Sequence, residues 1–546
     1  MKLSNLLAIS GLFAVIDAVP TSRREILAKK PNILFIMTDD LDLKMNSPAY
    51  MPHVMSDIKG KGVEFANHFV TTTLCCPSRV SLLTGKQAHN TNVTNVSPPW
   101  GGYPKFVERG LNEDFLPVWL QNAGYNTYYA GKLMNGHGVD NYNVPHVNGF
   151  NSSDFLLDPY TYSYLNSTYQ RNHDPPVGYE GHYTTDVTAE KTLGFLEDAL
   201  ESDRPFFLAT SPIAPHANIE PSALASEGDT FMTVAVSEPQ YEHLFQDAKV
   251  PRTRNFNPKD PTGANWIKTL PLQNQTIIDY EDHYYRQRLR SLQSVDDLVN
   301  SLIKRLERSG QLENTYIIFT SDNGYHIGQH RLAPGKSTGF EEDIRVPFYI
   351  RGPGVSEGGV DNTVTTHIDL APTFFELAGI QLREDFDGTP MRVAEKSSRI
   401  AHEHVTVEYW GSAPIEGKYA SVASPPGTER NTYKSIRILG EGYNLYYSVW
   451  CSNEHELYDL ANDPYEIHNL YHGQSQNETD PQLFGRDLST LVPRLDALLM
   501  VLKSCKGNTC IKPWGILHPD GSVQSLTDSM DERYDKFYED QPKVSY

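Results

Sequence analysis

The chain has 546 residues and a formal net charge of −21, with 47 lysines and arginines against 68 aspartates and glutamates. A chain of this length can bury a large core, and we expect two domains. The acidic balance argues against nucleic acid as a partner, because nucleic-acid binding needs basic patches.

The N-terminus has the pattern of a secretory signal peptide over residues 1–18. Lys2 precedes an apolar run from Leu6 to Ile16, and the small residue Ala18 follows. No later apolar run reaches the roughly 20 residues of a membrane span, so we expect no span. Several Asn-x-Ser/Thr sequons support a glycoprotein of the secretory pathway, either secreted or kept in a vacuole or lysosome. The sequons begin at Asn92, Asn95, Asn151, Asn166, Asn274 and Asn477.

Apolar runs that end in charged or ligating residues indicate strands of an open sheet. Ile33 to Met37 is unbroken, as in a strand buried on both faces, and leads into Asp39 and Asp40. The other predicted strands are Tyr125 to Ala130, Pro205 to Ser211, Tyr316 to Ser321 and Val346 to Ile350. Helical patterns lie between or after them at Leu116 to Ala123, Thr185 to Leu200, Arg286 to Arg308 and Ile368 to Leu377. This alternation predicts an α/β fold, a large and mostly parallel sheet with helices on both faces.

Two regions, residues 139–190 and 220–275, show little periodicity and are predicted to be long surface insertions. From about residue 395 the pattern changes to short antiparallel strands and one apolar helix. The strands are Val405 to Trp410, Tyr433 to Leu439, Leu445 to Trp450 and Glu456 to Leu460, and the helix is Leu488 to Leu502. We therefore predict a first domain of residues 19–394 and a smaller α+β domain of residues 395–546. We expect the charged tail from Asp528 to be poorly ordered.

The stretch from Cys75 to Gly85 predicts a short helix. Pro77 suits a first helical turn and Gly85 the position just past the last one. Cys75 would then stand just before the helix N-terminus, which favours an anion, and Arg79 adds a fixed positive charge. This is the outline of an ester hydrolase for anionic substrates. A disulfide pair or a redox thiol is the alternative, since adjacent cysteines are a weak signal.

Oxygen ligands follow two of the predicted strands. Asp39 and Asp40 end one, and Asp322 and Asn323 end another, at the edge where open α/β sheets place their sites. Three carboxylates and one amide, without histidine or thiolate, suit a hard divalent cation, with Ca²⁺ preferred over Mg²⁺. Two ordinary turns are the alternative reading, because Asp-Asn-Gly is a common turn sequence.

The run Cys75-x-Pro77-Ser78-Arg79-x-x-x-Leu83-Thr84-Gly85 resembles the signature of the formylglycine-dependent sulfatases. With Gly85-Lys86 and His89-Asn90 after it, it is most similar to the branch of N-acetylglucosamine-6-sulfatases and secreted fungal arylsulfatases, and the similarity continues to about residue 470. The resemblance implies the alkaline-phosphatase-like sulfatase fold. It also implies that formylglycine-generating machinery oxidises Cys75 to an aldehyde during maturation. Asp39, Asp40, Asp322 and Asn323 match the calcium ligands of the family.

The same resemblance assigns roles to further residues. Lys132 and Lys336 would ligate sulfate oxygens, and His216 would protonate the leaving alkoxide or phenoxide. Many arylsulfatases have Gly-Lys-x-His, whose histidine breaks the sulfated intermediate, and this chain lacks that near histidine after Lys132. His137 and His326 are the candidates to replace it; the alternative is that Asn135 holds the site while another base acts.

The function implied is an arylsulfatase acting on a small sulfate ester. N-acetylglucosamine-6-sulfatase, a phosphomonoester or phosphonate hydrolase, and an inactive glycan-binding homologue are the alternatives. The acidic chain argues against a long, densely sulfated polymer. Cys505 and Cys510 enclose a short loop and can pair in an oxidising compartment, whereas any pairing of Cys76 with Cys451 stays open.

Overall fold

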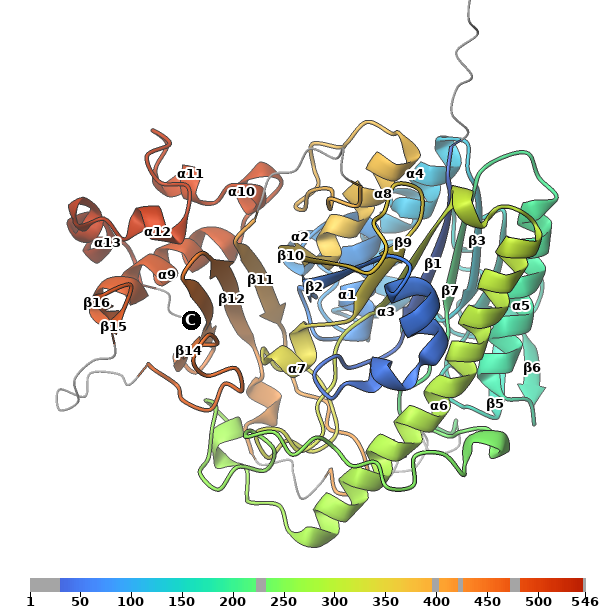
Figure 1. Cartoon of the computed structure of the whole chain (residues 1–546), viewed down its shortest axis with the longest axis horizontal. Helices are drawn as coiled ribbons and strands as arrows, with labels where there is room; N and C mark the ends of the chain where they lie inside the picture. The colour runs from blue at the N-terminus through green and yellow to red at the C-terminus, as the bar shows by residue number, and fades with distance from the viewer. Residues whose placement is uncertain (1–29, 222–231, 395–401, 421–425, 472–481, 544–546) are drawn as a thin grey trace, which may run out of the picture.

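The computed structural model describes residues 30–221, 232–394, 402–420, 426–471 and 482–543. A ten-stranded sheet crosses its larger part, in the order β10-β2-β9-β8-β1-β7-β3-β4-β5-β6 (Figure 1). Its strands are β1 (Asn32–Thr38), β2 (Val63–Phe69), β3 (Asn126–Gly131), β4 (Ser152–Leu156), β5 (Asn166–Arg171), β6 (Val177–Glu180), β7 (Phe206–Ser211), β8 (Thr315–Ser321), β9 (Phe348–Arg351) and β10 (Gly359–Thr366). The predicted α/β class is confirmed.

The centre of the sheet is parallel, and this aligns the strand ends. β1 pairs in parallel with β7 and β8, and β7 pairs in parallel with β3. Thr38 is level with Ser321, and Gly131 is level with Ser211. The residues that follow these strands therefore emerge at one edge. The sheet as a whole is mixed, because β9 runs antiparallel to both of its neighbours and β5 to both of its own.

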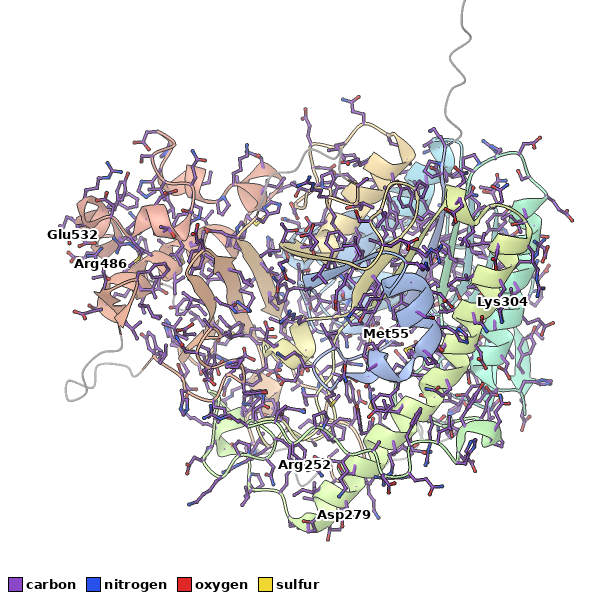
Figure 2. All side chains as sticks on the ribbon, in the orientation of Figure 1. Met55, Arg252, Asp279, Lys304, Arg486 and Glu532 are labelled. Atoms are coloured by element: carbon purple, nitrogen blue, oxygen red, sulfur yellow. A yellow bond between two sulfur atoms is a disulfide. The ribbon has the colours of Figure 1, made fainter. Side chains whose placement is uncertain are left out.

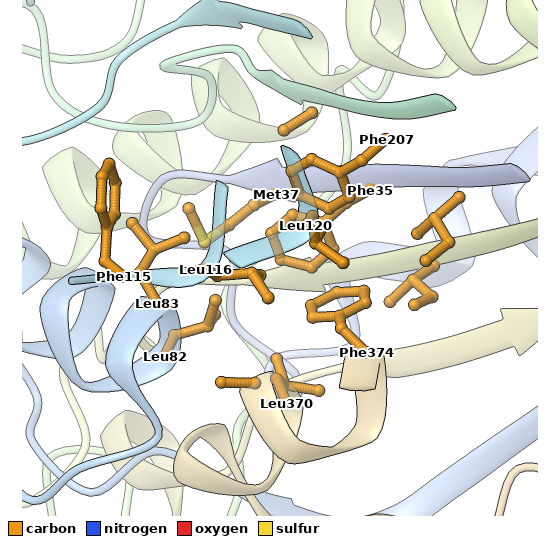
Figure 3. Packing of buried hydrophobic residues seen from close by; sticks show 14 of the residues in the cluster. Phe35, Met37, Leu82, Leu83, Phe115, Leu116, Leu120, Phe207, Leu370 and Phe374 are labelled. Carbon is orange, nitrogen blue, oxygen red and sulfur yellow. The ribbon is translucent and has the colours of Figure 1, made fainter. Parts of the chain in front are cut away.

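Helices cover both faces of the sheet because alternate strand residues point to opposite sides. Phe35 and Met37 pack with Leu82, Leu116 and Phe374 in one core (Figure 3). Leu34 and Ile36 belong to the core on the other face. The first core is covered by α1 (Cys75–Thr84), α3 (Gly102–Glu108), α4 (Leu116–Asn122) and α8 (Leu370–Ala378), and the second by α5 (Thr184–Leu200) and α6 (Gln275–Arg308). Figure 2 labels Asp279 and Lys304 near the two ends of the long helix α6.

The prediction that residues 139–190 form a surface insertion is wrong in part. β4, β5 and β6 lie within it and extend the sheet at one edge. Their sequences, such as Asn-Ser-Thr-Tyr-Gln-Arg in β5, are polar, so they lack the apolar run that marks a central strand. β2 and β10, at the opposite edge, were also not predicted. Helix α6 starts at Gln275, earlier than expected, because the Asn274 side chain caps it by accepting the N–H of Ile277 at 3.1 Å.

The C-terminal part is a four-stranded antiparallel sheet with helices packed on it (Figure 1). The strands are β11 (His404–Tyr409), β12 (Tyr433–Gly440), β13 (Tyr443–Trp450) and β14 (His455–Asp459), and the helices are α9 (Leu488–Leu502), α10 (Asn508–Ile511), α11 (Trp514–Leu517), α12 (Leu526–Ser529) and α13 (Asp535–Glu539). The described tail, to residue 543, is not the poorly ordered segment we expected. Tyr538 is buried, and Asp535 pairs with Arg494 at 2.7 Å.

Cys505 and Cys510 form the expected disulfide. Cys76 is buried and Cys451 is exposed, and both are free, so they do not meet. The structure describes no helix that is long and apolar enough to cross a membrane. Asn92, Asn151 and Asn274 are exposed, and Asn95 and Asn166 are half-buried. Glycosylation stays a prediction, and the signal peptide at 1–18 and Asn477 lie outside the described residues.

A buried ion pair links the two parts of the molecule. Glu408 of β11 accepts hydrogen bonds from the backbone N–H of His89 at 2.8 Å and from the Lys434 ammonium. His89 Nδ1 also lies 3.0 Å from Glu408 Oε2. His89 belongs to the short helix α2 (Ala88–Thr91), which follows α1, and Lys434 belongs to β12.

We expect Glu408→Gln to lower the free energy of unfolding by about 3 to 5 kcal/mol, because the buried Lys434 ammonium would lose its carboxylate. Burial would raise the pKa of Glu408, but Lys434 and His89 lower it from 4.5 to about 2. The pKa of Glu408 is therefore lower in the folded than in the unfolded protein. Its ionised form contributes to the free energy of unfolding in full above pH 4.5, and this contribution is lost as the pH falls towards 2. Urea unfolding of the wild type and of Glu408→Gln, at about pH 7 and at about pH 3, measures the difference in their free energies of unfolding. An equal difference at both pH values would contradict the assignment.

Candidate active site

Two carboxylate-bearing strand ends meet as the sequence predicts. The backbone N–H of Asp40 donates to Asp322 Oδ1 at 3.0 Å, and Asn323 Nδ2 donates to Asp40 Oδ1 at 2.8 Å. Asp39 and these three residues are fully buried. The parallel pairing of β1 with β8 brings them together, since Thr38 and Ser321 are neighbours.

Helix α1 delivers Cys75 and Arg79 to these carboxylates. Cys75 is the first residue of the helix, and its Sγ lies 3.5 Å from Asp39 Oδ1 and 3.9 Å from Asp40 Oδ1. Arg79 is one turn further on, and its Nε donates to Asp322 Oδ2 at 2.8 Å. The helix ends at Gly85, whose φ of 67° places it in the left-handed region that glycine tolerates best.

Two lysines and a histidine complete the arrangement. Lys132 Nζ lies 2.5 Å from Asp39 Oδ2, and Lys336 Nζ lies 2.6 Å from Asp40 Oδ1. His216 Nε2 lies 3.6 Å from Asp40 Oδ2, and its Nδ1 is 2.8 Å from the carbonyl oxygen of Ala217. A carbonyl can only accept, so Nδ1 carries a proton and Nε2 faces the site. Together these residues form what we call the Cys75 cluster: Cys75, Arg79, Lys132, His216, Lys336, Asp39, Asp40, Asp322 and Asn323.

The charged groups of the cluster shift one another's pKa values. Burial would raise the pKa of Asp39, but Lys132, His216 and Arg79 outweigh it and lower the pKa to about 2. Burial would lower the pKa of Lys336, yet Asp40 raises it well above its usual value. Burial raises the pKa of the Cys75 thiol well above its usual value, so the unmodified side chain stays a neutral thiol. Reactive thiols need a depressed pKa, and Cys75 is free, so neither a redox thiol nor a disulfide fits.

The residues fit a hard divalent cation. Asp39, Asp40, Cys75 and His216 each offer a ligand atom, and these atoms lie within 4.8 Å of one another. Asn323 Nδ2 is used in hydrogen bonds to Asp40 and Gly324, whereas its buried Oδ1 has no hydrogen-bond partner among the described residues. An unpartnered buried amide oxygen beside carboxylates is the donor expected of a calcium ligand.

The two remaining candidate histidines, His137 and His326, lie in different surroundings. His137 is fully buried among aromatic rings, 4.4 Å from the ring of Tyr103 and 5.3 Å from that of Phe155, and burial lowers its pKa to about 3. No hydrogen bond or ion pair joins it to the described Cys75 cluster. His326 donates its backbone N–H to the Gly335 carbonyl at 2.9 Å, beside Lys336, and its Nδ1 lies 2.8 Å from Asp343 Oδ1.

Sequence reasoning missed residues that hold the site in place. Arg79 Nη1 donates to Ser211 Oγ at 2.9 Å, and Ser211 ends β7. The Tyr162 ring stacks on His216 with centroids 4.1 Å apart. Ser211 could have been found from the sequence, because it is the last residue of a predicted strand and therefore lies at the edge where the site was expected. Tyr162 lies in the region we predicted as a surface insertion and carried no signal.

Two more supporting residues come from distant parts of the chain. Arg288 of α6 is fully buried and donates to the carbonyl oxygens of Asp40 and of Pro215, the latter at 3.1 Å. Glu416 Oε1 lies 3.7 Å from Lys336 Nζ, although Glu416 follows β11 of the C-terminal part. Neither residue was predicted from the sequence. Arg288 is a single arginine in an amphipathic helix and Glu416 a single glutamate in a loop, and neither has a local sequence pattern that predicts burial beside the site.

Comparison with known proteins identifies the family. Residues 31–380 match the family model of the sulfatases, and residues 328–490 match the model named "N-sulphoglucosamine sulphohydrolase, C-terminal". The chain belongs to the sulfatase family. The similarity read from the Cys75 signature is therefore confirmed.

Relatives and solved structures extend the match over most of this sulfatase. The arylsulfatase of Volvox carteri is 40% identical over 540 residues, covering 93% of this chain and 80% of that protein. The human N-acetylglucosamine-6-sulfatase is 32% identical over 538 residues, covering 94% and 90%. A protein solved with its substrate D-glucosamine-2-N,6-O-disulfate superposes with a TM-score of 0.61 and 22% identity, over 82% of this chain and 95% of the other. This last likeness supports the fold alone.

Proposed function

We propose that this sulfatase hydrolyses sulfate monoesters to an alcohol or phenol and inorganic sulfate, with Cys75 acting as formylglycine. The observation that carries the proposal is the placement of Cys75. Its side chain stands at the N-terminus of α1, within 4 Å of two carboxylates, in a buried cluster that also contains three cationic side chains. An anionic ester that reaches this point meets positive charge and a potential nucleophile together.

The proposed reaction begins with hydration of the Cys75 aldehyde to a geminal diol. One hydroxyl oxygen attacks the sulfur and passes its proton to Asp39, whose Oδ1 lies 3.5 Å from Cys75 Sγ, and the S–O bond to the alcohol breaks. His216 gives the departing oxygen its proton from Nε2, the nitrogen that faces the site. The second hydroxyl then loses its proton as the aldehyde reforms, and this expels sulfate. His326 is the candidate base for that proton, because it lies beside the loop that carries Lys336.

Asp39, Asp40, Asp322 and Asn323 are proposed to hold Ca²⁺, with Mg²⁺ as the weaker candidate. When bound, the cation would supply neutralising charge for a sulfate oxygen and polarise the formylglycine hydroxyl. The three carboxylates already balance the three cations Arg79, Lys132 and Lys336 in number. A divalent ion would therefore leave the site positive, which suits an anionic ester.

The substrate class proposed is an aryl sulfate. Relatives named arylsulfatase at about 40% identity support it. N-acetylglucosamine-6-sulfate is the second candidate, supported by the relatives named for that substrate at 32 to 33% identity. A panel of 4-nitrophenyl sulfate, N-acetylglucosamine-6-sulfate and 4-nitrophenyl phosphate separates these classes by kcat/KM. Faster turnover of the phosphate would favour the phosphomonoester alternative. Substrate binding without turnover in fully modified protein would favour the inactive homologue.

The protein is proposed to mature in the secretory pathway, where formylglycine-generating machinery would act on Cys75. The protein would then be secreted or kept in a vacuole or lysosome. Mass spectrometry of the tryptic peptide Gly62–Arg79 from protein made in a secretory host tests the modification. We expect Cys75 to have lost its sulfur and two hydrogens and gained an oxygen. An unmodified thiol in active, well-secreted protein would overturn the proposal.

A further inference from the structure

A second cluster of ligating side chains is buried outside the Cys75 cluster. His330, Glu342 and Glu466 each offer a ligand atom, and the three atoms lie within 4.8 Å of one another. Their exposed fractions are 1%, 4% and 1%. They come from the loop after β8, from the short helix α7 (Glu341–Ile344) and from the segment after β14. Figure 1 shows α7 between the ten-stranded and the four-stranded sheets, so the cluster joins the two parts of the molecule.

In Glu342 and in Glu466, one carboxyl oxygen accepts a hydrogen bond and the other accepts none from the described residues. Glu342 Oε1 accepts from Asn255 Nδ2 at 2.9 Å, and Glu466 Oε2 accepts from the backbone N–H of Glu341 at 2.9 Å. Glu342 Oε2 and Glu466 Oε1 are buried and have no hydrogen-bond partner among the described residues. A buried carboxyl oxygen without a partner is costly, so two in one cluster point to a ligand.

The imidazole of His330 is held at both ring nitrogens. Its Nδ1 lies 2.8 Å from Thr262 Oγ1, and its Nε2 accepts a hydrogen bond from Asn255 Nδ2 at 3.3 Å, so a metal bound at Nε2 would replace that long hydrogen bond. The ring stacks on Phe340 with centroids 3.8 Å apart. Metal-binding histidines are usually fixed in this way by a hydrogen bond at the second ring nitrogen.

The surrounding charges do not neutralise the two glutamates. Glu341, next in the chain to Glu342, pairs with Arg437 at 2.7 Å and with Arg345 at 3.0 Å. Neither Glu342 nor Glu466 forms a salt bridge with any residue that the structure describes. A buried carboxyl group in this position needs a proton or a cation, since isolated buried charges are strongly disfavoured.

We propose that His330, Glu342 and Glu466 bind a divalent transition-metal ion that joins the loop carrying Lys336 to the C-terminal part. One imidazole and two carboxylates suit Zn²⁺ or Mn²⁺ better than Ca²⁺, which prefers oxygen ligands alone. The ion would fix both ends of residues 330–342, and Lys336 lies between them. The alternative is a proton shared by the two carboxyl groups, with no metal.

The test is metal binding by the full-length protein made in a secretory host. Chelator-treated wild type is titrated with Zn²⁺ and with Mn²⁺ in the presence of excess Ca²⁺, and bound metal is counted by plasma mass spectrometry. We expect one equivalent of Zn²⁺ or Mn²⁺ to bind beside the calcium, and Asp39→Asn to retain that equivalent. Failure of wild type to bind it, or its loss in folded Asp39→Asn, would overturn the proposal. Either outcome is independent of whether Cys75 is modified.

Glu466→Gln tests the ligand assignment. The glutamine oxygen can still accept from the backbone N–H of Glu341, but the carboxylate is lost. We expect the affinity for the added metal to fall by about 100-fold or more, while calcium content stays the same. Glu456→Gln is the matched control, because Glu456 is a buried glutamate of β14 whose oxygens accept from Trp450 Nε1 at 2.7 Å and from Tyr458 Oη at 2.9 Å. Equal metal affinity in Glu466→Gln and the control would refute the site.

Discussion

Cys75→Ser is expected to accept one sulfo group per molecule and then stop. Serine has a single hydroxyl, so it can attack the sulfur, but no second hydroxyl remains on the same carbon to expel sulfate. Loss of this internal release should lower steady-state turnover by a factor on the order of 10⁵ or more, comparable to removal of other catalytic nucleophiles. Intact-protein mass spectrometry after incubation with 4-nitrophenyl sulfate would detect the single added group.

The matched control for this variant is Cys76→Ser. Cys76 occupies the variable position of the signature, is the second residue of α1 and is buried in the core. It should lose some stability because a hydroxyl replaces a buried thiol, and it should still turn over many times. Sustained turnover by Cys75→Ser would reject the diol mechanism outright.

Lys336→Ala is expected to lower kcat by a factor on the order of 10²–10³, as for the loss of one preorganised donor at a developing charge. Lys336 Nζ lies 2.6 Å from Asp40 Oδ1 and is buried, so its charge acts where water does not screen it. Steady-state kinetics with 4-nitrophenyl sulfate measures the effect.

Lys268→Ala, at an exposed lysine that pairs with Glu454, provides the control for removal of a positive charge from the chain. Its kcat should be unchanged. Circular dichroism melting of Lys336→Ala separates a catalytic loss from unfolding. A folded Lys336→Ala enzyme with wild-type kcat would show that this lysine does not contact the reacting sulfate.

Part of the fold was predictable because central strands carry their own signal. Ile33 to Met37 and Tyr316 to Phe319 are unbroken apolar or aromatic runs, since both faces of a central strand are buried. The strands β4, β5 and β6 were not predicted, because strands rich in polar residues resemble loops; of the three, only β6 is an edge of the sheet. The tail after Asp528 was misjudged for a similar reason, since its charges are paired only in three dimensions, as Asp535 is with Arg494.

The sequence by itself determined the Cys75 signature and the ligand residues at the strand ends, because these lie within short segments or directly follow strands. It also determined the family, which the comparisons confirm. Only the tertiary structure decided that Arg288 and Glu416 support Asp40 and Lys336, and that His137 lies in the aromatic core. It alone brought His330, Glu342 and Glu466 together. These contacts join residues far apart in the chain, and their geometry depends on how the helices and the two sheets pack, which no local pattern encodes.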